Sequence, residues 1–198
     1  MIRHAMLQDV MTRAARAILG AAVAAILASA AAAQDFDPFH SGGIPGLAKA
    51  GDYAGVQQRL DQGDSPNLTG VNGASALIIA AQSDHCNIVT LLLKRGARVD
   101  MKDQDGNTAL MAAAERGYVP CLEDLIAAHA DVNAGDRQGV TALMKAVRNG
   151  KIETVRALIR AKADVNATDY TGATALYYAR DGRQKSVLDA LRAAGGHD

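Results

Sequence analysis

The fold of this chain is decided by the stretch Thr108–Arg116, TALMAAAER, because its opening returns at a constant spacing. Thr-Ala-Leu recurs 33 residues later from Thr141 and a further 33 residues later from Thr174, and the related Ser-Ala-Leu stands 33 residues earlier, from Ser75. A fixed period of this length over four copies is typical of repeat architectures, in which each copy folds as one unit and stacks on its neighbours.

Each copy predicts two short helices. The Thr hydroxyl is placed to cap the first helix, the apolar run after it buries one face, and Gly117 or Gly150 ends the helix. The second helix has apolar residues at positions i, i+3 and i+4, as in Val155, Leu158 and Ile159.

A turn that contains an aspartate and a glycine joins each copy to the next. The three pairs are Asp103 and Gly106, Asp136 and Gly139, and Asp169 and Gly172. An Asp side chain at such a turn accepts hydrogen bonds from nearby N–H groups, and the Gly adopts a positive φ. Because the Asp recurs in every turn, we interpret it as a structural residue and not as part of a catalytic carboxylate cluster.

This pattern resembles the ankyrin repeat. The resemblance implies an all-α ankyrin-repeat solenoid of stacked helix-turn-helix units with short β-hairpin loops, in which four clear repeats follow a degenerate N-terminal capping repeat. It covers residues 42–198, with repeats at about 42–74, 75–107, 108–140, 141–173 and 174–198.

The chain departs from the family signature at two positions. Ala replaces the signature Pro in all four clear copies, and the signature His is replaced by Ile78, Met111, Met144 and Tyr177. We expect these four side chains to pack between repeats. The alternative is a partly exposed apolar strip that helps to grip a partner.

The N-terminal segment predicts export. Arg13 and Arg16 precede an apolar, Ala-rich run that ends in small residues, which is the pattern of a secretory signal peptide over 1–33. Cleavage after Ala33 would be followed by a loose leader, 34–41. Cleavage after Ala30, a start at Met11 and a retained membrane anchor are the alternatives. The segment is typical of bacteria, so we expect a periplasmic protein, with full secretion as the other possibility.

Charge and motifs exclude several function classes. The chain has 21 basic and 21 acidic residues, and removal of 1–33 would leave 18 and 20, so it lacks the basic excess of a nucleic-acid binder. The sequence contains no catalytic motif, phosphate-binding loop or metal-ligand spacing that we can identify. We therefore expect a protein that is not an enzyme and has no catalytic, metal or cofactor site. We also expect no membrane contact beyond the cleaved signal.

The two cysteines, Cys86 and Cys121, occupy different repeat positions. We expect them to be packing residues and not a required disulfide, although an oxidising compartment would allow a bond between neighbouring repeats.

The resemblance implies protein binding through the loop tips and the exposed side of the first helices, on the concave surface. Across the two central copies this strip has five basic side chains and two acidic ones, which predicts a partner with an acidic patch. We also expect the protein to be a monomer. A secreted effector that acts on a host protein, or an enzyme, is the alternative. The predicted protein-binding residues are Lys102, Gln104, Asp105, Asn107, Glu115, Arg116, Arg137, Gln138, Lys145, Arg148, Asn149, Tyr170 and Tyr178.

Overall fold

The computed structural model of the protein describes residues 43–182 and 184–197. The predicted signal peptide, 1–33, and leader, 34–41, lie outside these residues. The described part of the chain forms ten α-helices and one short 3-10 helix, η1 (Val71–Gly73), and contains no extended strand.

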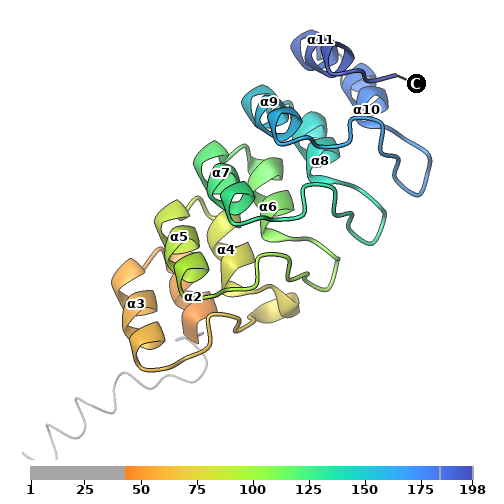
Figure 1. Ribbon diagram of the computed structural model, residues 1–198. Helices are drawn as coiled ribbons and strands as arrows, with labels where there is room; N and C mark the ends of the chain where they lie inside the picture. Colours follow the sequence, from red (N-terminus) through yellow and green to blue (C-terminus); the bar gives the residue numbers. More distant parts are fainter. Residues whose placement is uncertain (1–42, 183, 198) are drawn as a thin grey trace, which may run out of the picture. The chain divides into compact units, whose positions relative to one another are not determined.

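The ten helices form five antiparallel pairs that stack in one direction (Figure 1). The first helices of the pairs are α2 (Gly43–Ala50), α4 (Ala76–Gln82), α6 (Ala109–Arg116), α8 (Ala142–Arg148) and α10 (Ala175–Asp181). The second helices are α3 (Tyr53–Asp61), α5 (Cys86–Lys94), α7 (Val119–Ala127), α9 (Ile152–Arg160) and α11 (Lys185–Ala193). Each first helix packs against the first helix of the next repeat, and the second helices do the same. None of these helices has the length and apolar character needed to cross a membrane. The prediction of an all-α ankyrin-repeat solenoid is confirmed.

The first helices begin where the sequence predicts. The hydroxyl oxygens of Thr108, Thr141 and Thr174 accept hydrogen bonds from the backbone N–H groups three residues later, and Ser75 does the same in its repeat. Each cap satisfies one N–H group that has no partner within its own helix.

Small side chains let the first helices approach closely. The alanines that follow the caps are at most 1% exposed, at Ala76, Ala109, Ala142 and Ala175. Ile78, Met111 and Met144 are also buried, so the expected packing between repeats is confirmed for them. Tyr177 is 59% exposed and does not follow the expectation, because α10 packs on α8 alone among the first helices and leaves its outer side uncovered.

The loops between repeats are hairpin-like. Isolated antiparallel bridges join Thr69 to Ser75, Gly135 to Thr141 and Thr168 to Thr174. The loops extend to one side of the helix stack, beside the first helices (Figure 1). The candidate binding residues lie on these loops and on the first helices or directly after them.

Candidate functional site

Backbone hydrogen bonds hold the loop tips in register. The N–H of Gln104 donates to the carbonyl of Asn72 at 3.0 Å, that of Arg137 to the carbonyl of Asp105 at 3.0 Å, and that of Tyr170 to the carbonyl of Gln138 at 2.9 Å. Side chains on successive tips are therefore carried on a continuous, mutually supported backbone.

The turn aspartates shape each tip, as predicted. Oδ1 of Asp136 accepts hydrogen bonds from the N–H groups of Gln138 and Val140, and Asp103 and Asp169 make the same pair of bonds in their own turns. The glycine of the turn is required. Gly106 has a φ of +84°, and a Cβ there would lie 2.8 Å from the backbone N of Arg137.

The second carboxylate oxygen of Asp136, Oδ2, forms a salt bridge with Lys145. It lies 2.9 Å from Nζ of Lys145, and both side chains are shielded from solvent, at 5% and 14% exposure. Burial alone would raise the pKa of Asp136. The hydrogen bonds from Lys145, Gln138 and Val140 outweigh this effect and hold the pKa below its usual value of 3.8.

Asp169 has an equivalent partner in Tyr178. Tyr178 follows Asp169 by nine residues, as Lys145 follows Asp136. The Tyr178 hydroxyl donates to Oδ2 of Asp169. Burial would raise the pKa of Asp169, but hydrogen bonds from Thr171, Tyr178 and the backbone lower it to about 2. The hydrogen bond to Asp169, followed by burial, raises the pKa of Tyr178. The guanidinium of Arg148 lies 5.4 Å from the centre of the Tyr178 ring, within cation–π distance.

The predicted binding residues divide into three groups. Lys145 and Tyr178 are engaged with turn aspartates, and half-buried Asn107 donates its side-chain amide to Asp103. Lys102 is exposed, but its Nζ donates to the carbonyl of Gly135 in the next loop at 2.8 Å. The others are exposed at the loop tips and on or beside the first helices, and we call them the concave strip after the surface on which the resemblance places them; they are Gln104, Asp105, Glu115, Arg116, Arg137, Gln138, Arg148, Asn149 and Tyr170.

A groove lies at the N-terminal end of this surface, where sequence reasoning predicted no cavity. It has a volume of about 480 Å³ and is lined by α2, α4, α6 and the loops around Asn72 and Asp105. Its apolar lining includes Val71, which is 85% exposed, and half-buried Ile79. These two residues occupy the repeat positions of Gln104 and Ala112, so the 33-residue register could have located them.

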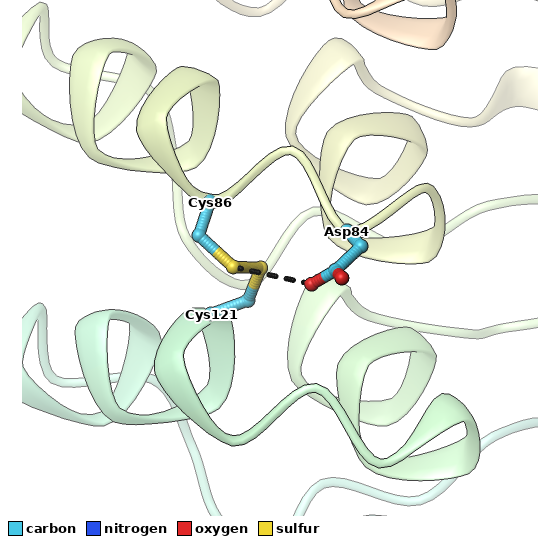
Figure 2. A group of neighbouring side chains, drawn as sticks. All are labelled: Asp84, Cys86 and Cys121. Atoms are coloured by element: carbon cyan, nitrogen blue, oxygen red, sulfur yellow. Dashed lines mark hydrogen bonds between the residues drawn. A yellow bond between two sulfur atoms is a disulfide. The ribbon is translucent and has the colours of Figure 1, made fainter.

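Cys86 and Cys121 form a disulfide between α5 and α7 (Figure 2). This corrects the expectation of packing residues without a disulfide in favour of its alternative, a bond between neighbouring repeats. Their separation of 35 residues exceeds the repeat by two. Residues at identical positions of stacked helices point in the same direction and cannot face each other. An offset of two turns a side chain by about 200° around its helix, so that Cys121 faces back toward Cys86.

Asp84 lies beside the disulfide. Its Oδ1 is 3.7 Å from Sγ of Cys86, the contact drawn as a dashed line in Figure 2. A disulfide sulfur has no proton to donate, so this contact becomes a hydrogen bond only when Cys86 is a free thiol. The carboxylate and the two sulfurs lie within 4.8 Å of one another, but thiolate ligands for a metal would also require reduction of the bond.

Comparison with known proteins agrees with this architecture. The family model described as "Ankyrin repeats (3 copies)" matches residues 47–136 and 120–197. None of the curated proteins compared with the chain matches its sequence. Ankyrin repeats are in general protein–protein interaction modules. With most of its length matched by the family model and with the stacked helix pairs of that family, the chain belongs to the ankyrin-repeat proteins.

Proposed function

We propose that this protein is an exported binding module that recognises a partner protein through its concave strip. The observation that carries the proposal is the arrangement of the tips. Arg137, Gln138 and Tyr170 are exposed on backbone segments that hydrogen-bond to the preceding tip. A preorganised surface loses little conformational entropy when it binds, and Arg and Tyr are frequent hot-spot residues.

The partner that we propose carries an acidic patch opposite the central repeats. Arg116, Arg137 and Arg148 are exposed there, whereas Lys145 is neutralised by Asp136. Three arginines favour carboxylates that can accept paired hydrogen bonds from a guanidinium.

Two observations support export to an oxidising compartment, for which we propose the periplasm. The sequence pattern of 1–33 is that of a signal peptide. The Cys86–Cys121 disulfide is of a kind that persists outside the reducing cytosol.

Cross-linking in living cells tests the proposal. A photoreactive residue at position 116, 137 or 148 should capture the same partner, and one at Lys94 on α5 should not. Mass spectrometry then identifies the partner, and fractionation locates the complex. A complex found only in the culture medium would favour a secreted effector. Failure of all three positions to capture a common protein would reject the proposed function.

A further inference from the structure

We infer that the groove between α2, α4 and α6 binds a segment of the partner in which a Lys or Arg is next to an aliphatic side chain. This inference rests on the proposed function and adds a second point of contact to it. The surface would thus recognise opposite charges in two neighbouring regions: the acidic groove near the N-terminal repeats, and the arginine strip, formed by Arg116, Arg137 and Arg148, in the central repeats.

In the repeat that lines the groove, the first helix lacks the residue that contacts the turn aspartate in the next two repeats. Nine residues after each turn aspartate, the first helix carries Lys145 opposite Asp136 and Tyr178 opposite Asp169. The equivalent residue for Asp103 is Ala112, whose side chain is too short to reach the carboxylate. Ala112 and Asp103 both line the cavity.

Asp103, which lines the groove, therefore receives no hydrogen bond from its first helix. Oδ1 of Asp103 accepts hydrogen bonds from the backbone N–H groups of its turn, as in the other repeats. Oδ2 accepts a 3.2 Å hydrogen bond from the neutral side-chain amide of Asn107. Where the other turn aspartates receive an ammonium or a phenol from the helix, a partner's Lys or Arg can supply the donor here.

Charge around the cavity favours the same occupant. Asp103, Asp105 and Glu115 line it, and the basic residue among its lining is Lys49. Asp105 and Glu115 are exposed, so they can attract a cation before it enters the groove.

The remaining lining is suited to a hydrocarbon side chain. Pro45, Ala74, Ile78 and Ile79 contribute apolar surface, and Val71 lies at the rim with 85% of its area exposed. The cavity volume of about 480 Å³ lies within the range of pockets that enclose small ligands, roughly 300–1,000 Å³. It can hold an aliphatic side chain together with the stem of a neighbouring Lys or Arg.

Selection from a random octapeptide display library on the intact disulfide-bonded protein tests this inference. Enriched peptides should contain Lys or Arg adjacent to Leu, Ile or Val. The variant Ala112→Lys copies the Lys145–Asp136 arrangement into this repeat, and it should weaken the binding of those peptides by about tenfold or more. The matched control Ala127→Lys makes the same substitution at the exposed C-terminal end of α7, outside the groove and the strip, and should change the binding much less. Circular dichroism of both variants checks that the helices remain.

The outcomes separate this inference from the proposed function. Enrichment of acidic peptides that depend on Arg137 and Arg148 would overturn the acidic groove and leave the arginine strip in place. Absence of enrichment, or equal binding by wild type and Ala112→Lys, would also overturn it. Loss of binding in Ala112→Lys, with retention in the triple variant Arg116→Glu, Arg137→Glu and Arg148→Glu, would support the groove independently of the strip.

Discussion

The backbone N–H of Arg137 donates a 3.0 Å hydrogen bond to the carbonyl oxygen of Asp105, one repeat earlier. The two side chains have opposite charges and both are exposed, at adjacent tips. Because the bond joins their main chains, the spacing between the basic tip and the acidic tip is fixed before any partner arrives. The acidic groove and the arginine strip meet at this point.

Charge reversal of the strip should abolish binding while the fold survives. The variant Arg116→Glu, Arg137→Glu and Arg148→Glu should slow association with the cross-linked partner, most strongly at low salt, where screening is weak. Loss of the Arg148–Tyr178 contact should cost about 1 kcal/mol or less. Surface plasmon resonance at two salt concentrations measures the effect. A matched control reverses Lys94, Lys162 and Arg192, which are exposed at or just beyond the ends of second helices. Normal binding by the strip variant together with loss in the control would move the site to the opposite face.

The disulfide should make a measurable contribution to stability. Reduction, or the variant Cys86→Ala with Cys121→Ala, should lower the free energy of unfolding by about 2–4 kcal/mol, because the unfolded chain regains the entropy of a loop closed across 35 residues. Urea denaturation with and without a dithiol measures this difference. The dithiol should have no effect on the double variant, and an equal effect on both proteins would contradict the assignment.

Acid should destabilise the protein through Asp169. Its pKa in the folded protein is about 2, against 3.8 for an ordinary Asp, so the stabilisation is complete above about pH 4 and is lost as the pH falls toward 2. Asp169→Asn should lower the free energy of unfolding by about 2 kcal/mol at pH 7, since a charged acceptor is lost, and should flatten its decrease below pH 4. Denaturation at pH 7, 4 and 2.5 tests this. Asp181→Asn, at an exposed position of α10, is the control and should leave the pH profile unchanged.

The protein purified from its producing cells should begin at or near Gln34. The motive is the signal-like pattern of 1–33, which ends in Ala31-Ala32-Ala33. N-terminal sequencing or intact-mass measurement decides the matter. A chain that still starts at Met1 or Met11 and sediments with membranes would show that the segment is an anchor.

The fold could be predicted because the residues that determine each local structure recur in four copies. The caps at Thr108, Thr141 and Thr174 are confirmed in detail, since a cap needs only a hydroxyl and the next turn of its own helix. The turn aspartates are confirmed for the same reason, because their partners lie within four residues.

Contacts between repeats were harder to predict. From the sequence alone, Lys145 was predicted to be an exposed cation that is available to a partner. The structure shows that the loop containing Asp136 packs beside α8, so that Asp136 neutralises Lys145. That Asp103 has no partner on its first helix follows from comparing Ala112 with Lys145 and Tyr178, whose contacts with the turn aspartates only the structure shows. The disulfide was only the alternative in the sequence analysis, because the two cysteines occupy different repeat positions, although this offset is what turns the two sulfurs toward each other.

The same covalent link sets how the chain would respond to a pulling force. A solenoid contacts only its neighbours, so tension applied at the two ends can peel helix pairs away one after another. The bond between Cys86 and Cys121 spans 35 residues, and its Cα atoms lie 4.7 Å apart. Even when every helix has been pulled out, that segment carries no load, and the extended chain is shorter by about 110 Å. Reduction of the disulfide would add this length to the extended chain in a single step. A change in redox conditions would therefore change the distance that the pulled chain can span.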